Sequence, residues 1–279
     1  MSKQSYTYSG DSPMLLKDFL KSCGISKKLL SKLKREHMGI TKNGELIRSI
    51  DIVQPNDTII LSIEDTSFLE PNSNLKVPIV YEDNNVVIFD KSHNMPIHPS
   101  IKHQGDTLGN YFAYLYPNTT FRPIIRLDRN TSGLCIVAKN QRACGILQKQ
   151  VIKTYYAVVS GLVDILGTID APIKRENDSI IKRIVAQDGQ KSVTHYRRIS
   201  YNEKYSLVEV TLETGRTHQI RVHFSYIGHA LAGDDLYGGS LEDIDRQALH
   251  CGKLIFPDVD TGRTIEVSSK IPSDMQSLT

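Results

Sequence analysis

Segments with a strand pattern follow one another through most of this chain, and few helical segments separate them. Alternating or wholly apolar runs predict strands at residues 86–89, 134–138, 155–159, 193–199 and 205–212. Amphipathic helices are expected near residues 108–115, 142–151 and 217–226. Because strands follow strands more often than they alternate with helices, the pattern predicts an α+β fold with a mixed, largely antiparallel sheet flanked by helices.

A carboxylate flanked by two arginines precedes one of these strands. Asp128 lies between Arg126 and Arg129, and a Thr-Ser-Gly turn separates it from the apolar run at 134–138. Two neighbouring guanidinium groups favour the ionised carboxylate, which is a poor proton shuttle at neutral pH but a usable nucleophile. A solvated charge cluster before an ordinary turn would explain the same residues, so this segment alone leaves both interpretations open.

A second polar segment, residues 214–223, follows the predicted strand 205–212. Thr217 is the expected N-cap of a helix, in which His218 and Arg221 lie three residues apart on one face. An amphipathic helix would also point apolar residues inward: Ile220, Phe224 and Ile227. That explanation accounts for the helix but not for the polar side chains crowded at its start, where loops often carry binding groups.

Together the two segments resemble the RluA-type pseudouridine synthases. The motifs of that family are Arg-Leu-Asp-x-x-Thr-Ser-Gly and, later, Gly-Arg-x-His-Gln-Ile/Leu-Arg-x-His. The resemblance covers about residues 78–270 and includes four further motifs in the expected order, at residues 91–99, 153–161, 231–238 and 249–250. It implies the pseudouridine synthase fold and an isomerase that converts uridine to pseudouridine in RNA.

The resemblance also implies roles for three catalytic residues. Asp128 would be the nucleophile, attacking either C6 of the ring or C1′ of the sugar. Arg221 would pair with Asp128 and fix its orientation. Tyr155 would stack on the extracted uracil, although a strand tyrosine packed in the core is the ordinary alternative.

Other polar residues are expected to contact RNA. Arg126 would fill the space that an extruded base leaves and hold phosphate, which a guanidinium does better than an ammonium. Arg216 is also expected to contact RNA, and three residues would shape the back of the site: His218, Gln219 and His223. The basic residues between 174 and 191 predict a hairpin near the RNA, although an exposed loop explains them equally well. For His223 and His250, packing or hydrogen bonding is expected ahead of catalysis.

Three departures from the family pattern keep a second function in view. Ile125 stands where the family usually has His, Ser92 where it has Pro, and Pro257-Asp258 where it has His-Pro. An RNA-binding or ribosome-assembly factor with weak or lost catalysis would tolerate such changes. The retained nucleophile, tyrosine and arginine favour the active enzyme, because catalytic residues that act as a unit are usually lost early.

Positive charge is concentrated near the N-terminus. Between Lys17 and Arg48 there are nine Lys or Arg residues and three acids, a local net charge of 9 − 3 = +6 in a chain of net +3. Such concentration is typical of a surface that binds a polyanion, although a solvated helix face is the common alternative. The residues expected to bind RNA here are Lys27, Lys28, Lys32, Lys34 and Arg35.

The pattern around these cations predicts two helices and a small sheet. Ser12-Pro13 is the expected start of the first helix and Ser26 the N-cap of the second. Asn43-Gly44 predicts a hairpin turn, and residues 58–63 a strand. This order resembles the S4-type RNA-binding module. We therefore expect an S4-like module at 1–65, a linker at 66–77 and a catalytic domain at 78–279.

Composition narrows the class of protein. With 39% hydrophobic and 23% charged residues among 279, the chain is typical of a globular protein. No run approaches the roughly 18 apolar residues of a membrane span, and the start lacks the apolar core of a signal peptide. Four cysteines without a Cys-x-x-Cys pair indicate neither zinc nor a disulfide framework. A cytoplasmic protein without a membrane partner is expected.

The expected chemistry requires no cofactor. No Gly-rich phosphate loop is visible, which argues against a nucleotide cofactor. Uridine and pseudouridine differ only in the ring atom bonded to C1′, so neither a redox group nor a metal is required. The expected partner is structured RNA, with ribosomal RNA ahead of transfer RNA, and the expected oligomeric state is a monomer.

Overall fold

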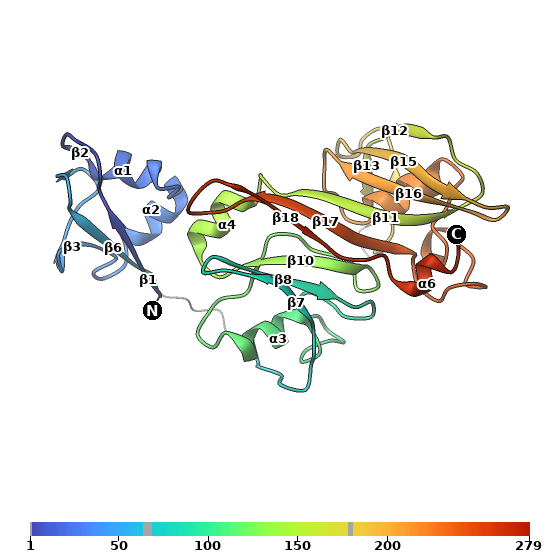
Figure 1. The fold of residues 1–279 in the computed structure, drawn as a ribbon, viewed down its shortest axis with the longest axis horizontal. Helices are drawn as coiled ribbons and strands as arrows, with labels where there is room; N and C mark the ends of the chain where they lie inside the picture. The colour runs from blue at the N-terminus through green and yellow to red at the C-terminus, as the bar shows by residue number, and fades with distance from the viewer. Residues whose placement is uncertain (1, 64–68, 178–180) are drawn as a thin grey trace.

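The computed structural model describes residues 2–63, 69–177 and 181–279 of the chain (Figure 1). Its main feature is a ten-stranded sheet with the order β12-β15-β16-β11-β17-β10-β8-β7, to which β18 adds beside β17 and β9 beside β10. The strands are β7 (Ile79–Glu82), β8 (Val86–Lys91), β9 (Arg122–Pro123), β10 (Ser132–Ala138), β11 (Ile152–Ser160), β12 (Leu166–Asp170), β15 (Val193–Tyr201), β16 (Tyr205–Leu212), β17 (Leu249–Pro257) and β18 (Thr264–Ser268).

The predicted mixed, largely antiparallel sheet is confirmed. Among its described strands, β10 and β17 pair in parallel, and the other neighbours pair antiparallel. A two-stranded hairpin, β13 (Ile173–Arg175) and β14 (Arg183–Val185), projects beside the sheet. The hairpin expected from the basic residues at 174–191 is therefore present.

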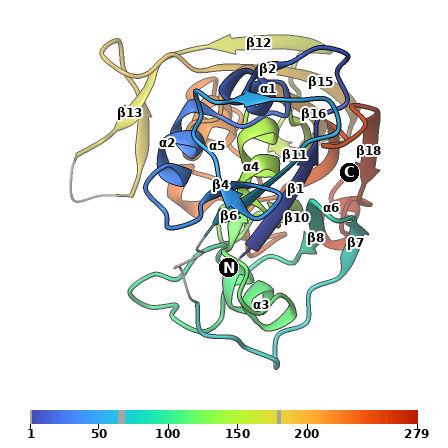
Figure 2. The ribbon, with the colours of Figure 1, turned by 90° about the vertical axis from the view of Figure 1, so that its left-hand side faces the viewer.

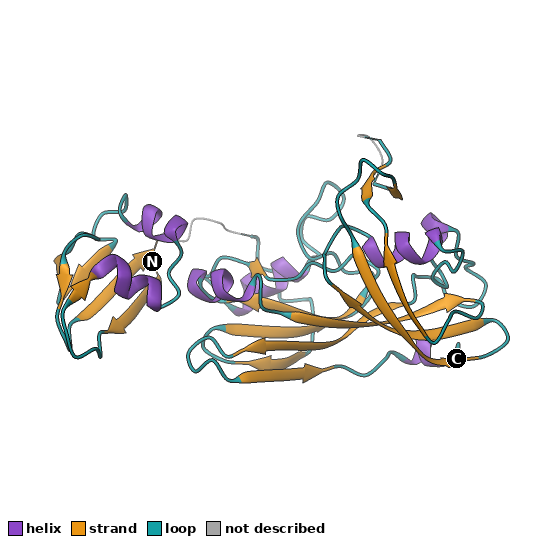
Figure 3. Ribbon diagram, turned by 90° about the horizontal axis from the view of Figure 1, so that it is seen from above, coloured by secondary structure: helices purple, strands orange, loops and turns teal. Residues whose placement is uncertain are grey.

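Helices pack on both faces of the sheet (Figure 3). Helices α3 (Leu108–Leu115), α4 (Gln141–Leu147) and α5 (Gln219–Tyr226) contribute side chains to the main core, and α6 (Ser273–Gln276) lies on the opposite face. Successive strand residues point to opposite faces. Accordingly, Ala157 and Val159 of β11 join the main core, whereas Val158 packs in a second cluster with Met275 of α6. The sheet is thus buried on two sides at its centre.

The close approach of β10 to β17 explains the glycine of the Thr-Ser-Gly turn. Gly133 pairs with Cys251 and adopts φ +107°. A Cβ atom there would lie 2.3 Å from the carbonyl oxygen of Cys251, closer than real Cβ contacts allow. Only glycine combines that backbone conformation with that approach. The turn therefore fixes where β10 begins, immediately after the Asp128 segment.

The N-terminal residues form a separate small unit with a hydrophobic core of its own (Figure 1), and Figure 2 views the molecule from the side of this unit. Residues 2–63, which we call the N-terminal module, contain the sheet β1-β6-β3-β4 and the strand pair β2-β5. Its elements are β1 (Ser2–Thr7), β2 (Met14–Leu15), α1 (Leu16–Ser22), α2 (Lys27–Leu33), β3 (Ile40–Lys42), β4 (Glu45–Leu46), β5 (Ile52–Val53) and β6 (Thr58–Ile63). Arg142 of α4 links this module to the main sheet, because its Nε donates to the carbonyl of Cys23 at 2.8 Å.

Several local predictions for the module are confirmed. Ser26 caps α2, with its hydroxyl accepting from the backbone N–H of Leu29 at 3.2 Å. Asn43 and Gly44 both have positive φ, as a two-residue hairpin turn requires, and they join β3 to β4. Parts of the predicted module and linker, residues 64–68, lie outside the described residues.

Three predicted helix ends were wrong. The first helix starts at Leu16 rather than at Ser12-Pro13, because Met14 and Leu15 pair with β5 and Leu16 N–H donates to the carbonyl of Asp51. The helix predicted at 142–151 ends at Leu147, since residues from Ile152 join the sheet as β11. The N-cap of α5 is His218, not Thr217. In all three cases tertiary contacts override local sequence preference.

None of the helices in the described ranges is long and apolar enough to cross a membrane.

A buried histidine beside the Thr-Ser-Gly turn should make folding sensitive to acid. His250 is 1% exposed, its Nδ1 lies 3.0 Å from the Ser132 hydroxyl, and burial lowers its pKa to about 4. The unfolded chain, with an ordinary histidine pKa, then binds more protons between pH 6.5 and 4. We expect about 3 kcal/mol of stability, present above pH 6.5, to be lost as the pH falls to 4.

Denaturant unfolding at pH 7 and pH 4 tests this expectation with two variants. His250→Gln cannot titrate in this range, so its free energy of unfolding should change with pH by about 3 kcal/mol less than that of the wild type. His93→Gln, at an exposed position, is the matched control and should retain the wild-type pH dependence. Equal pH dependence in all three proteins would contradict the assignment to His250.

Candidate active site

Asp128 lies in a turn between β9 and β10. Buried residues alternate with more exposed ones along the segment that leads to it. Ile125 and Leu127 are buried in the main core, whereas Arg126 is exposed and Asp128 half-buried; Arg126 and Asp128 line the pocket, to whose wall Leu127 also contributes. The backbone N–H of Thr131 donates to the carbonyl of Asp128 at 3.1 Å and closes the turn. Ile125, the departure nearest the chemistry, is buried in the main core and also lines the wide groove beside the pocket.

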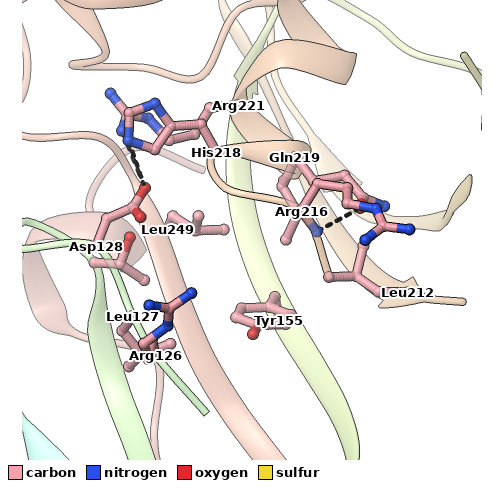
Figure 4. Close-up of a pocket in the computed structure, with 12 residues that line it drawn as sticks. Arg126, Leu127, Asp128, Tyr155, Leu212, Arg216, His218, Gln219, Arg221 and Leu249 are labelled. Carbon is pink, nitrogen blue, oxygen red and sulfur yellow. Dashed lines mark hydrogen bonds and ion pairs between the residues drawn. The ribbon is translucent and has the colours of Figure 1, made fainter. Parts of the chain in front are cut away.

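A buried arginine orients the Asp128 carboxylate (Figure 4). Arg221 Nη1 donates to Asp128 Oδ2 at 3.0 Å. The same guanidinium makes a two-point ion pair with Asp234, from Nε to Oδ2 at 2.7 Å and from Nη2 to Oδ1 at 2.8 Å. Two parallel bonds of this kind fix the plane of the guanidinium. Asp234 therefore determines the direction in which Arg221 reaches Asp128.

In the network of Asp128, Arg221 and Asp234, the buried positive charge of Arg221 is compensated by buried negative charge on Asp234. Asp234 is 1% exposed and Arg221 7%. Burial by itself would lower the pKa of Arg221, but the carboxylates of Asp234 and then Asp128 raise that pKa above its ordinary value. Arg221 consequently remains a cation at any physiological pH and leaves Asp128 one firm ionic partner.

His218 stands beside the same carboxylate. Its Nε2 lies 3.7 Å from Asp128 Oδ2, and its Nδ1 lies 2.8 Å from the hydroxyl of Tyr237. That hydroxyl also accepts from the backbone N–H of Arg183 at 2.9 Å, and its own proton is available to Nδ1; in the tautomer that uses it, the His218 proton lies on Nε2, toward Asp128. Burial lowers the pKa of His218, against the opposing effect of Asp128, so the ring is neutral near pH 7.

The turn before α5 is built around Gln219 rather than opened to solvent. Gln219 Oε1 accepts from Arg216 N–H at 3.0 Å and from the Thr214 hydroxyl at 2.9 Å. Its Nε2 donates to Val193 O and to the Thr194 hydroxyl, both at 3.0 Å. With its side chain engaged in this way, Gln219 positions the turn. His218, which directly precedes Gln219 in the chain, has φ +58°. This left-handed conformation directs its ring into the pocket.

Tyr155 lies across the pocket from this network (Figure 4). It projects from β11, is 8% exposed, and shares the wall with apolar side chains of Leu127, Leu212 and Leu249. Burial raises the pKa of Tyr155 well above its ordinary value, so the phenol stays protonated at neutral pH. A protonated ring between apolar walls is suited to stack on a planar base.

The inner pocket opens into two wider, basic regions. The inner space of about 60 Å³ lies between Asp128 and Tyr155, and Arg126 stands at its opening, exposed. A groove of about 660 Å³ continues from it, and a second of about 510 Å³ runs along the β13–β14 hairpin. Cations dominate the charge of the second groove: Arg126, Lys174, Arg175, Arg183 and Arg216, with Asp188 as the acid.

The structure brings the predicted catalytic residues together but separates them from the N-terminal cations. Asp128, Tyr155 and Arg221 line one pocket, together with four of the predicted RNA contacts: Arg126, Arg216, His218 and Gln219. The cations at and after α2 lie in the N-terminal module, where Lys27, Lys28, Lys34 and Arg35 are exposed and Lys32 is half-buried. Arg129 turns to the upstream loop and donates to the side chain of Asn94 at 2.9 Å.

Sequence reasoning missed Asp234 and Tyr237. Both lie in the motif at 231–238, to which the family resemblance assigns no residue roles. A Gly-Asp pair does not by itself reveal that the carboxylate is buried against an arginine thirteen positions earlier. The described residues hold no group of three His, Cys, Asp or Glu side chains arranged to bind a metal ion.

Comparison with known sequences agrees with this geometry. The family described as RNA pseudouridylate synthase matches residues 85–226. The Bacillus subtilis protein named "Uncharacterized RNA pseudouridine synthase YjbO" is 39% identical over 95% of this chain and 98% of its own length. Ribosomal large subunit pseudouridine synthase D of Pseudomonas aeruginosa is 35% identical over 84% of this chain and 81% of its own.

A solved structure supports the fold as well. Human RNA Pseudouridylate Synthase Domain Containing 1 superposes with a TM-score of 0.60 and 28% identity, over 72% of this chain and 86% of that one.

Proposed function

This chain belongs to the RNA pseudouridylate synthase family, which makes it an isomerase, and we propose that Asp128 is its catalytic nucleophile. The observation that carries the proposal is the 3.0 Å bond from Arg221 to Asp128, in a pocket that Tyr155 closes from the other side. A carboxylate held by a permanent cation keeps an ionised oxygen directed at a bound sugar or base. Tyr155 and the leucine walls supply the surface on which the uracil stacks.

The proposed reaction is balanced without an external reactant. The N1–C1′ bond of uridine breaks, the base rotates while it is held, and a C5–C1′ bond forms. The proton at C5 leaves and N1 gains one, so there is no net oxidation. Asp128 serves as the nucleophile at either C1′ or C6. Release of tritium from RNA labelled at uridine C5 measures the reaction directly, and absence of release with every candidate RNA would contradict it.

We propose ribosomal RNA of the large subunit as the target, ahead of transfer RNA. The support is the name of the Pseudomonas aeruginosa relative together with the cationic surface of the N-terminal module. We propose a cytoplasmic location as well, since ribosomal RNA is the proposed substrate. Pseudouridine mapping by carbodiimide-blocked reverse transcription, in a strain lacking this gene and in the complemented strain, identifies the position; a missing site in tRNA alone would overturn the rRNA assignment.

The geometry does not favour an inactive assembly factor. Ile125 packs in the core, and Asp258 caps a surface turn by accepting from Thr261 N–H at 2.6 Å. Ser92 contributes its carbonyl to the buried ammonium of Lys91 at 2.8 Å. None of the three departures therefore removes a polar group from among the residues that line the inner pocket.

Arg126 is expected to act in base extrusion. It is exposed at the opening of the inner pocket and also lines both grooves. Arg126→Ala should lower kcat/KM about 10- to 100-fold on RNA whose target uridine is paired, because unstacking a base costs a few kcal/mol. The loss should be several-fold smaller where the uridine lies in an open loop. Arg263→Ala, at an exposed arginine that lines neither the inner pocket nor the two grooves, is the matched control and should resemble the wild type; equal losses on both RNAs would exclude this role for Arg126.

A further inference from the structure

An apolar groove lies on the N-terminal module, apart from the catalytic pocket. It encloses about 440 Å³ and is lined by Leu33, Met38, Ile40, Leu46, Ile47 and Ile50, among others. Three of these large apolar side chains are exposed: Met38 by 37%, Leu46 by 65% and Ile50 by 62%. Exposed apolar side chains gathered in one concave place are unusual for a small module and indicate a binding surface.

The backbone conformation of Met38 also supports a binding role for this groove. Met38 adopts φ +56°, a left-handed conformation that favours glycine or asparagine. A long apolar side chain is thus kept where its backbone is strained, between α2 and β3. Strain of this kind persists at positions that contribute to binding.

The charges around the groove are complementary to a polyanion. Lys34 and Arg48 line it, with Glu36 as the acid among the lining residues. Exposed cations continue from Lys34 along α2, and the segment from Lys17 to Arg48 carries the local net charge of +6. An apolar floor beside cations suits a ligand that joins a flat, weakly polar ring to phosphates. A paired helix hides its bases, so the ring must come from an unpaired nucleotide.

We propose that this groove binds one unpaired nucleotide of the substrate RNA, with its base on Met38 and Ile50 and its phosphates near Lys34 and Arg48. The inference rests on the proposed function in that RNA is the ligand. It assigns to the N-terminal module a preference for RNA with a bulge or loop, in addition to its general affinity for phosphate.

Fluorescence anisotropy of the full-length protein with two labelled RNAs tests the proposal. One RNA is a short duplex with a single bulged nucleotide, and the other is the same duplex without the bulge. Met38→Gly removes the side chain and relieves the backbone, so the module should remain folded by circular dichroism. Ile50→Ser is the second groove variant. Ile52→Ser, an equally exposed isoleucine outside the groove lining, is the matched control.

The two groove variants should bind the bulged RNA about tenfold more weakly and the plain duplex as the wild type does. The salt dependence of binding should not change, because no phosphate contact is removed. Lys28→Ala should instead weaken binding to both RNAs and reduce the salt slope by about one. Ile52→Ser should match the wild type.

Two results would overturn the proposal. Equal losses on the bulged and plain duplexes would mean that the groove does not contact an unpaired base. Unchanged binding of both RNAs by the groove variants would mean that the groove does not bind RNA, and would favour an apolar protein segment as its ligand. Tritium release from a minimal stem–loop that carries the target uridine reports the chemistry separately, so failure of the groove proposal is distinguishable from failure of the proposed catalytic function.

Discussion

Asp128→Asn should abolish pseudouridine formation while the protein still folds and binds RNA. The substitution keeps the size and hydrogen-bonding shape of the side chain but removes the nucleophilic charge. We expect tritium release to fall by about 10⁴-fold or more, as it does when a member of a catalytic unit is removed. The protein should remain folded because Arg221 keeps its two-point ion pair with Asp234 and is not left as an uncompensated buried charge.

Single-turnover assays with saturating enzyme, together with filter binding, separate the two effects. The dissociation constant for RNA should stay within about threefold of the wild-type value, since Asp128 contributes no cation to the phosphate contacts. Asp106→Asn, an exposed carboxylate outside the pocket lining, is the matched control and should retain full activity. Substantial activity in Asp128→Asn would show that another group is the nucleophile.

Asp234→Asn should lower turnover, although Asp234 acts through Arg221 and not by contact with the substrate. Asn keeps one acceptor for Arg221 but loses the second charged contact, so the guanidinium is free to rotate and its bond to Asp128 lengthens. We expect kcat to fall about 100-fold with KM within about threefold, because positioning a catalytic group accurately is worth several kcal/mol. The free energy of unfolding should fall by about 2–3 kcal/mol, since a buried ion pair has been broken on one side.

The neighbouring residue, Asp235, provides the control for Asp234→Asn. Asp235 is exposed and caps the adjacent backbone N–H of Leu236, so Asp235→Asn should leave both kcat and stability near wild type. Assays below the unfolding transition of Asp234→Asn, with the folded fraction measured by circular dichroism, remove the trivial explanation of unfolded enzyme. A loss confined to stability, with normal kcat for the folded fraction, would reduce Asp234 to a structural residue.

The strands and several turns were predictable because their causes are local. The apolar run of β10, the alternation in β16 and the cap of α2 by Ser26 each depend on residues within a few positions of one another. The two catalytic segments were recognisable for the same reason, since each keeps its charged residues at short, fixed spacings. The pairing of Asp128 with Arg221 followed from the family resemblance and agrees with their 3.0 Å contact.

What the sequence could not supply depends on contacts between distant positions. The first helix starts late because Met14 and Leu15 pair with β5, some forty residues away. Gln219 was expected at the back of the site and lines the pocket, but its hydrogen bonds to Val193 and Thr194 of β15 were not foreseen. Hydrogen-bond partners of this kind are chosen by how strands and helices come together, which no local pattern specifies.

The sequence by itself, through the family resemblance, was enough to single out the residues to which we assign the proposed chemistry: an aspartate before a buried strand and an arginine on a later helix. Only the tertiary structure decided how they are held. Burial of Asp234 beneath Arg221 fixes the guanidinium, and the left-handed turn at His218 brings a neutral imidazole to the same carboxylate. The orientation of Asp128 is therefore set by groups 90 and more residues away, because a buried ion such as Arg221 depends on the partners that the fold places beside it.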